Sequence, residues 1–357
     1  MLKKVSDRSK QHLFIAPFPP VEGGITLLSE DLVNYLNGSK SISVETLDIN
    51  FRRPWFIRFL KFIKVIILIP IKIAQSDNVS MHLTARAVLW IGFYISVTCK
   101  ILKKPIIFRK FAGSFDIDVD RGGSIYRNAV SFIMGNCICL LETKYLLNEF
   151  KRRFPDAEIY EFANHRNLNE ACVESDKLDI EKVRFVYAGQ VKKSKGIGEI
   201  IEAVALLNEN GYQKTFEFDL YGSTENKSIE NLVSAQKGII YKGIVSHGDL
   251  MGIFPSYDAL VFPTYHGGEG IPGVIIEAMS CGVIPIVSDW RSVREPIPDK
   301  IDLIVEAKNA ESLFLAMEKF IKNVDYYRSL SGEIRKASEY YRTDKWGRRF
   351  EEIIMSL

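Results

Sequence analysis

The sequence predicts an α/β protein made of two doubly wound domains, and three observations favour this fold class. The chain has 357 residues, which suits two domains of roughly 150 residues each. Short apolar segments alternate with helical stretches in two separate series, and such alternation is typical of parallel sheets covered by helices. A polar segment without clear periodicity, residues 165–182, separates the two series. With 47% hydrophobic and 25% charged residues, the composition excludes a disordered or fibrous chain.

The first series begins with a buried strand that ends at a Pro- and Gly-rich loop, PFPPVEGG. The helix after this loop carries apolar residues at helical spacing and stops at Gly38. The expected strands are 12–17, 43–49, 78–83, 105–111, 136–141 and 157–163, and the expected helices are 25–38, 55–74, 84–102 and 143–153.

The second series begins at VRFVYAG and repeats the same alternation. Its expected strands are 183–189, 216–222, 238–243, 258–264, 283–289 and 303–306, and its expected helices are 196–209, 226–236, 247–256, 273–281 and a C-terminal stretch from 310. The predicted domains are 1–164 and 183–339, with a linker at 165–182 and a final helix at 340–357. In open α/β sheets, ligands bind beyond the carboxyl ends of the strands, so we expect the site in a cleft between the domains.

Basic residues concentrate in the first half of the chain. Between Asp48 and Asp116 the only acidic residue is Asp77, while Lys and Arg recur throughout the span. This pattern predicts an anionic partner, although solvated helix faces neutralised by acids elsewhere would explain it equally well. No apolar run approaches the roughly 18 residues of a membrane span, and no signal-peptide pattern precedes the first strand. We therefore expect a cytoplasmic protein, soluble or peripheral on the inner face of the membrane.

Residues 54–74, PWFIRFLKFIKVIILIPIKIA, combine aromatic bulk with cations. At about 100° per residue, Arg58, Lys61 and Lys72 fall within about 60° of one another, and Lys64 is offset. This composition is typical of an interfacial helix that lies on anionic lipid. The alternative is a helix packed on the sheet whose Lys side chains extend to solvent. Because aliphatic runs interrupt the basic residues and no recognition motif occurs, nucleic acid is not an expected partner.

The strongest local pattern is YHGGEGIPGVIIEAMSCGVIPIVSD, residues 265–289. A predicted strand leads into a Gly-dense loop, and Pro272 occupies the first position of the next predicted helix. Glycines let backbone N–H groups approach an anion, and the helix N-terminus adds a positive dipole end. Glu269 and Glu277 bracket this loop and can accept hydrogen bonds from sugar hydroxyls. Each also has a structural explanation, Glu269 as a solvated loop residue and Glu277 as a complement to the helix dipole.

This segment resembles the nucleotide-sugar motif of the retaining glycosyltransferases of family four. That motif has two Glu separated by seven residues, and Glu269, GIPGVII, Glu277 and AMSCGVIP match it. The resemblance continues in KGIVSHGDLMGIFPSYDALVFPT, VYAGQVKKSKGIGEIIEAVALL, PFPPVEGGI and FANHRNL, so it spans most of the chain. It implies the GT-B fold, in which two Rossmann-like domains face across a cleft and the C-terminal helix returns to the N-terminal domain.

The resemblance also implies residue roles. Glu277 would bond the ribose hydroxyls, Glu269 would hold hydroxyls of the transferred sugar, and Lys195 would neutralise the diphosphate together with backbone amides. The turn at 243–245 would contact the base. The implied catalytic residues are Glu269 and Lys195, and the implied donor-binding residues are Glu277, Gly23, Gly24, Gln190, Gly270, Ile271, Pro272, Gly273 and Val245.

Two positions depart from the family pattern. Gln190 stands where an Arg usually shares the diphosphate with the Lys, so the leaving group would depend on Lys195 and a neighbour, Lys192 or Lys193. The family's His in an N-terminal loop is absent, because this chain has FAGS at 111–114. We expect Gly113 and Ser114 on the acceptor side, with His82 either as a substitute for that His or as a structural residue at a strand end.

The acidic segment DIDVD, residues 116–120, is similar to the metal-binding Asp-x-Asp of the other glycosyltransferase architecture. The surrounding pattern is that of GT-B enzymes, in which lysine and helix dipoles neutralise the diphosphate. We therefore expect a solvated or acceptor-side loop here, no metal site and no cofactor, with the nucleotide diphosphate sugar as co-substrate.

The resemblance implies transfer of a sugar, with retention of anomeric configuration, from a nucleotide diphosphate sugar to a saccharide or polyprenyl-diphosphate-linked saccharide. Surface polysaccharide or glycolipid synthesis is the expected context, and an anionic membrane surface is an expected partner of residues 54–74. The alternatives are a nucleotide-sugar epimerase or phosphorylase of the same architecture, and a non-catalytic partner that binds nucleotide sugar, which Gln190 would suit.

Overall fold

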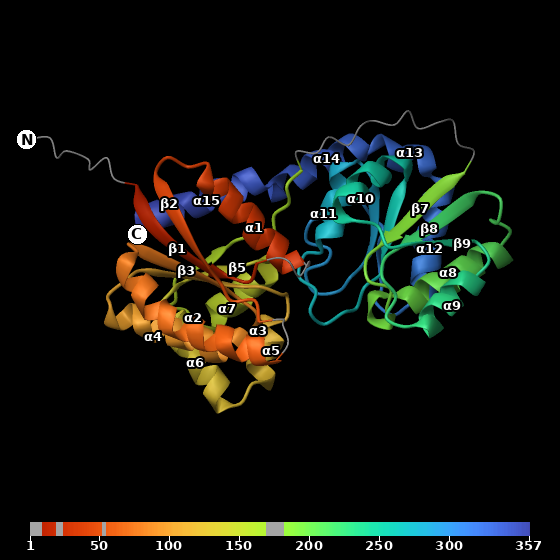
Figure 1. Ribbon diagram of the computed structural model, residues 1–357. Helices are drawn as coiled ribbons and strands as arrows, with labels where there is room; N and C mark the ends of the chain where they lie inside the picture. The colour runs from red at the N-terminus through yellow and green to blue at the C-terminus, as the bar shows by residue number, and fades with distance from the viewer. Residues whose placement is uncertain (1–8, 19–23, 52–54, 169–181) are drawn as a thin grey trace, which may run out of the picture. The chain divides into compact units, whose positions relative to one another are not determined.

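The computed structural model describes residues 9–18, 24–51, 55–168 and 182–357. The chain divides into two compact units (Figure 1), of which the first comprises Met1–Asn167 and Thr343–Leu357 and the second Leu168–Arg342. Each unit is built on a six-stranded sheet whose strands are all parallel. The predicted fold class of two doubly wound α/β domains is confirmed.

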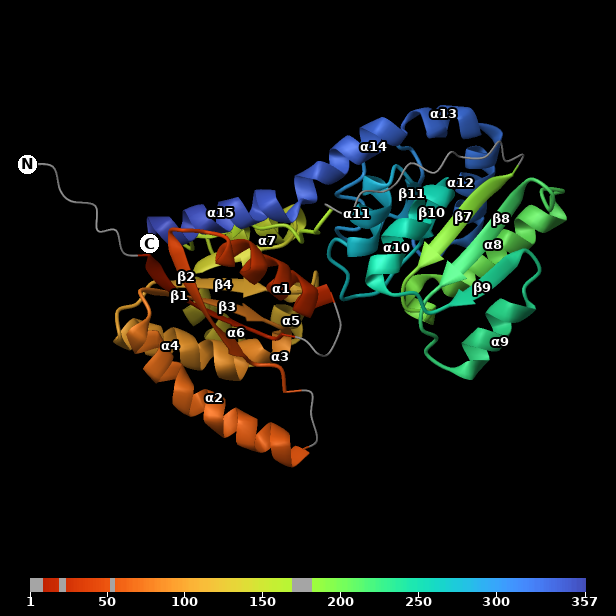
Figure 2. The same cartoon turned by 45° about the horizontal axis from the view of Figure 1, so that its top comes forward.

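In the first unit the sheet has the strand order β2-β1-β3-β4-β5-β6. Figures 1 and 2 show α1 and α15 on one face of this sheet and α2, α4 and α6 on the other. The elements are β1 (Lys10–Ala16), α1 (Gly24–Asn37), β2 (Ile42–Asp48), α2 (Trp55–Gln75), β3 (Asn78–Leu83), α3 (Ala85–Ala87), η1 (Val88–Gly92), α4 (Phe93–Ile101), β4 (Ile106–Lys110), α5 (Phe115–Arg121), α6 (Ser124–Met134), β5 (Ile138–Leu141), α7 (Lys144–Arg153), β6 (Ile159–Glu161) and α15 (Thr343–Ser356).

The C-terminal helix α15 packs on the sheet of the first unit, as predicted. Its Phe350 is fully buried, and the Phe350 ring centroid lies 6.2 Å from that of Phe14 on β1 and 5.6 Å from that of Phe162 after β6. The N–H of Thr343 donates to the carbonyl of Arg166 at 3.0 Å. The last residues of the chain therefore complete a core that begins with its first strand.

Two local expectations for the first unit need correction. The single helix expected over 84–102 is broken, because the π-helical turn η1 separates α3 from α4. The loop expected over 116–120 is instead helical and belongs to α5. Its carboxylates have protein partners: Asp116 accepts from the Tyr145 hydroxyl, Asp118 pairs with Lys110, and Asp120 pairs with Arg153.

In the second unit the strand order is β12-β11-β10-β7-β8-β9. The core consists of side chains from all six strands together with those of the covering helices. The elements are β7 (Val183–Ala188), η2 (Lys193–Lys195), α8 (Ile197–Glu209), β8 (Phe216–Tyr221), α9 (Lys227–Ala235), β9 (Ile239–Gly243), α10 (His247–Ile253), η3 (Phe254–Ser256), β10 (Ala259–Phe262), α11 (Gly273–Ser280), β11 (Ile284–Ser288), β12 (Ile304–Val305), α12 (Ala310–Lys322), α13 (Val324–Ser329), α14 (Ser331–Ser338) and η4 (Glu339–Tyr341). Among the helices of the described residues, none combines the length and the apolar content needed to cross a bilayer.

Candidate functional site

The loops that follow β7 and β10 are packed tightly together in the second unit. Gly196, directly after η2, has φ 82°, in the left-handed region that favours glycine. A Cβ at Gly196 would lie 2.3 Å from the carbonyl oxygen of Pro263, so a larger residue would separate the two loops. The N–H of Tyr265 donates to the carbonyl of Ser194 at 2.9 Å, which fixes the loop after β10 against η2.

This packing brings together the two predicted catalytic residues. The ammonium of Lys195 forms an ion pair with the carboxylate of Glu269, and the side chains remain 14% and 11% exposed. The ammonium also lies 5.3 Å from the centroid of the Phe262 ring, within the range of a cation–π contact. Burial and the charge of Lys192 lower the pKa of Lys195 to about 8, whereas the Glu269 carboxylate favours the charged ammonium. The ion pair is largely shielded from water, but its exposed part allows a ligand to take the place of either partner.

The Gly-rich loop ends in the buried helix α11. The helix begins at Gly273, and Pro272 is its N-cap with φ −65°, one position earlier than predicted. Residues 270–273 are buried, so the start of the helix follows directly on the loop that carries Glu269. The first N–H groups of a helix have no acceptor within it, and together with the helix dipole they favour an anion.

Glu277 lies within α11 and is 3% exposed. Its neighbours Ile276 and Ala278 are fully buried, so the helix is surrounded by core on most sides. A carboxylate at this depth needs hydrogen-bond donors around it. Glu269 and Glu277 therefore differ in setting, because the first is paired in a loop and the second is enclosed within a helix.

The turns that follow β7, β8 and β9 also meet. A Cβ at Gly222 would lie 1.7 Å from the carbonyl oxygen of Gly189, and the N–H of Gly222 donates to the carbonyl of Gly243 at 2.8 Å. Gln190 follows the first of these turns and is exposed, while Val245 follows the last and packs against the core. The predicted donor-binding residues of this unit thus gather at the carboxyl edge of one sheet.

His266 was not predicted, yet it lies beside the ion pair. Its Nδ1 is 3.2 Å from the hydroxyl of Ser194, and its carbonyl accepts a hydrogen bond from the Trp290 indole at 3.0 Å. Burial and the cations Lys192 and Lys195 lower the pKa of His266. A neutral imidazole is therefore favoured here. The sequence signal was its position immediately before Gly267 and Gly268 in the loop.

The predicted residues of the first unit have other settings. Gly23 lies outside the described residues, and Gly24 begins α1. Gly113 is buried, and Ser114 is the partly buried N-cap of α5.

His82 is a core residue in this structure. Its side chain is fully buried and its ring stacks on Phe14, with the centroids 4.0 Å apart. Its Nε2 lies 3.1 Å from the Ser80 hydroxyl. Burial, and after it the Arg109 cation, hold the pKa of His82 well below the usual range. An acceptor could not reach this ring without displacing the rings around it, among them Phe350 of α15, so the geometry favours the structural alternative for His82.

Two parallel sheets, each covered by helices, define a protein of two Rossmann-like units, and the second unit carries a lysine–glutamate pair before a Gly-rich helix N-terminus. Residues 173–337 match the family model described as glycosyl transferases group 1. This match confirms the predicted resemblance to glycosyltransferases over that part of the chain.

The curated relatives are glycosyltransferases by name. The chain is 26% identical over 163 residues to a putative teichuronic acid biosynthesis glycosyltransferase, TuaC, of Bacillus subtilis, covering 46% of this chain and 39% of the relative. It is 26% identical over 206 residues to an N,N'-diacetylbacillosaminyl-diphospho-undecaprenol alpha-1,3-N-acetylgalactosaminyltransferase of Campylobacter jejuni, covering 57% and 50%. The chain thus spans half or less of the length of these relatives.

Solved structures share the fold over nearly the whole chain. Anabaena Alr3699/HepE in complex with UDP superposes with a TM-score of 0.73 at 13% identity, covering 98% of this chain and 100% of that one. Sucrose-phosphate synthase from Thermosynechococcus elongatus gives 0.71 at 15% identity, covering 97% and 98%. These matches establish the architecture of the two units.

Proposed function

We propose that this protein is a retaining glycosyltransferase that moves a sugar from a nucleotide diphosphate sugar to a saccharide or lipid-linked saccharide acceptor. The observation that carries the proposal is the Lys195–Glu269 ion pair directly before the N-terminus of α11. A cation, a carboxylate and a helix N-terminus together suit a diphosphate joined to a hydroxylated sugar. Support for the donor and acceptor classes comes from the UDP-glucose complex of the Anabaena protein and from the diphospho-undecaprenol in the name of the Campylobacter relative.

In this proposal the bound donor replaces the Lys195–Glu269 ion pair with two contacts, one to each residue of the pair. Its diphosphate takes the ammonium of Lys195, and hydroxyls of the transferred sugar take the carboxylate of Glu269. The first N–H groups of α11 and the nearby Lys192 add positive potential, while the exposed Gln190 contributes a neutral donor. Glu277 accepts from the ribose hydroxyls, and the turn at 243–245 contacts the base.

The transfer step needs no protein nucleophile. The acceptor hydroxyl attacks the anomeric carbon from the face that the diphosphate leaves, the bond from that carbon to the diphosphate oxygen breaks, and the leaving phosphate takes the hydroxyl proton. Lys195 and the α11 amides stabilise the charge that develops on the diphosphate, and Glu269 holds the sugar in position. We propose that these groups neutralise the diphosphate without a metal ion.

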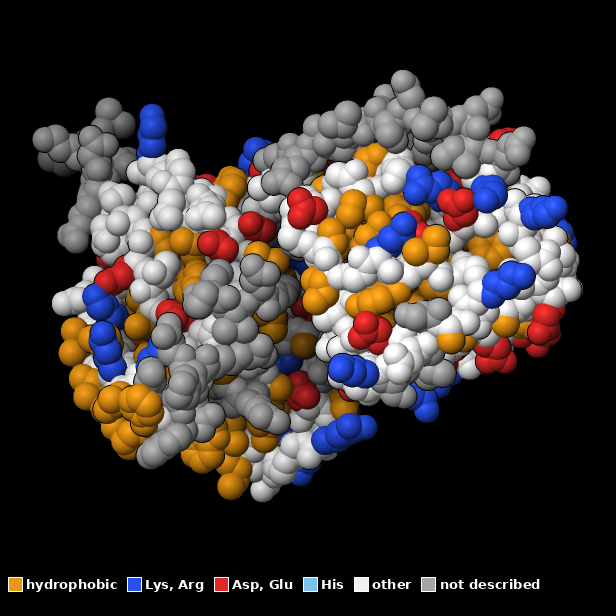
Figure 3. Space-filling model, turned by 45° about the vertical axis from the view of Figure 1, so that its right-hand side comes forward, with side chains coloured by type: hydrophobic (Ala, Val, Ile, Leu, Met, Phe, Trp, Pro, Cys, Tyr) orange, Lys and Arg blue, Asp and Glu red, His pale blue; other side chains and the backbone are white. Residues whose placement is uncertain are grey.

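The first unit is proposed to bind the acceptor and to attach peripherally to the inner face of an anionic membrane. Hydrophobic side chains gather beside Lys and Arg at the lower left of Figure 3. Large apolar side chains are exposed along α2 and on the helices that share its face of the sheet: Phe56, Phe59, Leu60, Phe62, Ile63, Ile67, Ile71, Trp90, Phe93, Ile101 and Ile125. An apolar surface of this size with nearby cations suits anionic lipid.

Two substitutions test the donor site. Glu277→Ala should weaken nucleotide-sugar binding about tenfold or more, because a charged hydrogen bond to the ribose is lost. Glu269→Ala should mainly lower turnover, because the sugar loses its positioning contact. A panel of nucleotide sugars is first screened by thermal stabilisation, and binders are then assayed for transfer to lipid-linked acceptors. Glu209→Ala, at an exposed position at the end of α8, is the matched control.

Unchanged steady-state kinetics in both variants would refute the site assignment. The same assay separates the alternatives. Conversion of the donor without any acceptor would favour an epimerase or phosphorylase. Donor binding without release of nucleotide, with every acceptor tried, would favour a non-catalytic binding partner.

A further inference from the structure

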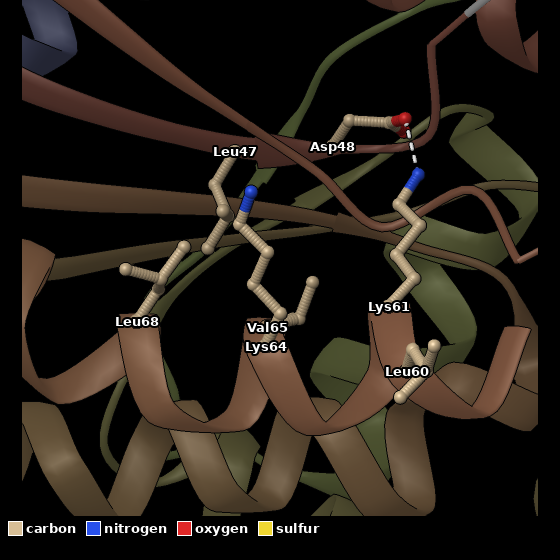
Figure 4. A pocket seen from close by; sticks show the side chains of 7 residues that line it. All are labelled: Leu47, Asp48, Leu60, Lys61, Lys64, Val65 and Leu68. Carbon is tan, nitrogen blue, oxygen red and sulfur yellow. Dashed lines mark hydrogen bonds and ion pairs between the residues drawn. The ribbon is translucent and has the colours of Figure 1, made fainter. Parts of the chain in front are cut away.

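A pocket lies between α2 and the end of β2 in the first unit (Figure 4). Its volume is about 530 Å³. Four of the lining side chains are apolar: Leu47, Leu60, Val65 and Leu68. The other three are charged: Asp48, Lys61 and Lys64. The pocket therefore combines hydrocarbon walls with a small number of charges, which is the pattern of a site for an amphiphilic ligand.

The charges in the pocket do not cancel. The ammonium of Lys61 bonds the Asp48 carboxylate at 2.5 Å and the Asn50 carbonyl at 2.8 Å, so these two residues neutralise each other. Lys64 makes no hydrogen bond or ion pair with any of the described residues. Figure 4 shows its side chain pointing from α2 toward Leu47, with the nitrogen inside the group of lining residues. The pocket thus carries one uncompensated positive charge.

The pocket also adjoins the exposed apolar row of α2. At about 100° per residue, Leu60 and Lys64 stand one turn apart on a line next to Phe56, Ile63 and Ile67. Leu60 belongs to both features, because it lines the pocket and is itself 63% exposed. A ligand bound to Lys64 can therefore extend onto the exposed row without leaving protein contact.

We propose that this pocket binds the phosphate group of a membrane lipid, with Lys64 on the phosphate and the lipid chain along the exposed row of α2. A single ammonium beside a neutralised carboxylate binds a free anion weakly, since water screens the charge. Each buried methylene of a lipid chain adds about fourfold in affinity, and this favours a lipid over free phosphate. The inference rests on the proposed membrane contact of the first unit and not on the sugar-transfer chemistry.

Titration calorimetry with soluble dihexanoyl phosphatidic acid tests the pocket directly, with inorganic phosphate as the chain-free probe. The lipid should bind at least tenfold more tightly than inorganic phosphate. Lys64→Gln should weaken lipid binding at least fivefold, and Leu60→Ser should weaken it without changing the response to phosphate. Lys151→Gln, at an exposed position on α7, should leave both affinities unchanged. Equal affinity for the two probes, or an unaffected Lys64→Gln variant, would overturn the proposal.

Vesicle flotation separates the pocket from general charge attraction. Vesicles of phosphatidylcholine with 20% phosphatidic acid, a composition chosen for the assay, should retain the wild-type chain and release more of Lys64→Gln than of Lys151→Gln. An equal loss in both variants would mean that only net charge matters, and the pocket assignment would fail. Nucleotide-sugar binding should be the same in Lys64→Gln and wild type. A wild-type chain without transfer activity would contradict the proposed function, whereas the lipid titration would be unaffected.

Discussion

The carboxyl edges of the two sheets both carry charged side chains, but in different surroundings. In the second unit, Lys195 and Glu269 form an ion pair whose members keep 14% and 11% of their side-chain surface exposed. In the first unit, Arg109 near the end of β4 and Glu142 after β5 are only 1% and 2% exposed. The residue types are comparable, so the difference lies in what covers them.

At the edge of the first sheet, aromatic rings enclose the charge. The guanidinium of Arg109 lies 4.8 Å from the Phe111 ring centroid and 4.5 Å from that of Phe162. Burial lowers the pKa of Arg109 to about 9, although the Glu142 carboxylate acts in the opposite direction. None of its guanidinium nitrogens has a hydrogen-bond partner among the described residues. Phe350 of α15 packs against Phe162, so the C-terminal helix helps to close this edge.

The two edges therefore differ in whether a ligand can reach their charged side chains. A substrate can replace the partner of Lys195, because the ammonium is reachable and its present partner lies in a loop. A substrate can reach Arg109 only if α15 or the surrounding rings move. The residue types alone would make both sheet edges candidate ligand sites. The difference in exposure favours the edge of the second unit, because its charged side chains can be reached by a ligand.

The largest expected effect follows from removal of the accessible cation. Lys195→Ala should lower turnover on the order of a thousandfold, or about 4 kcal/mol, because the leaving diphosphate loses its main side-chain counter-charge. The measurement is kcat with a saturating donor, and thermal melting checks that the variant is folded. Lys237→Ala, an exposed lysine of the same unit, is the control. A loss of less than tenfold would place the charge stabilisation elsewhere, with Lys192 as the next candidate.

The enclosed core of the first unit should instead affect the pH dependence of stability, and a buried histidine carries this prediction. Burial lowers the pKa of His12, on β1, to about 4, whereas an unfolded histidine titrates near 6.5. The unfolded chain therefore binds more protons between these values, so this contribution to stability is complete above about pH 6.5 and is lost as the pH falls toward 4. The loss attributable to His12 is about 3 kcal/mol.

Urea unfolding at pH 7.5, 6 and 5, followed by circular dichroism, measures this loss. His12→Gln should flatten the dependence, because the titrating group is gone while a polar side chain remains near Ser80. An unaltered slope in the variant would assign the dependence to His82 and His165, which are also fully buried.

The architecture and most of the proposed donor site follow from local sequence patterns. Alternating strands and helices predicted both parallel sheets, and the Gly-rich loop singled out Glu269 and Glu277. The ion pair itself could not be predicted. It depends on the close approach of Gly196 to Pro263, a contact between loops that follow two different strands.

The setting of His82 could not be predicted for a similar reason. A strand-end position places the side chain on one face of the sheet, but the covering residue is Phe350, far along the chain. The same limit explains His266, whose partners Ser194 and Trp290 come from other loops. Local patterns therefore identify residue types, and long-range packing decides which of them a ligand can reach.

The smallest expected effect is a pH dependence at the accessible edge. The pKa of Lys195 is lowered to about 8 by burial and by Lys192, so its cation is lost as the pH rises through that value. At pH 9 kcat/KM should fall about tenfold, or about 1.4 kcal/mol, if the cation is required. The diphosphate favours the charged ammonium, so kcat should fall only at higher pH than kcat/KM. Lys195→Arg should remove this decline, since a guanidinium stays protonated throughout. The same decline in Lys195→Arg would mean that another group titrates, and the lysine would then act through position and not through its proton.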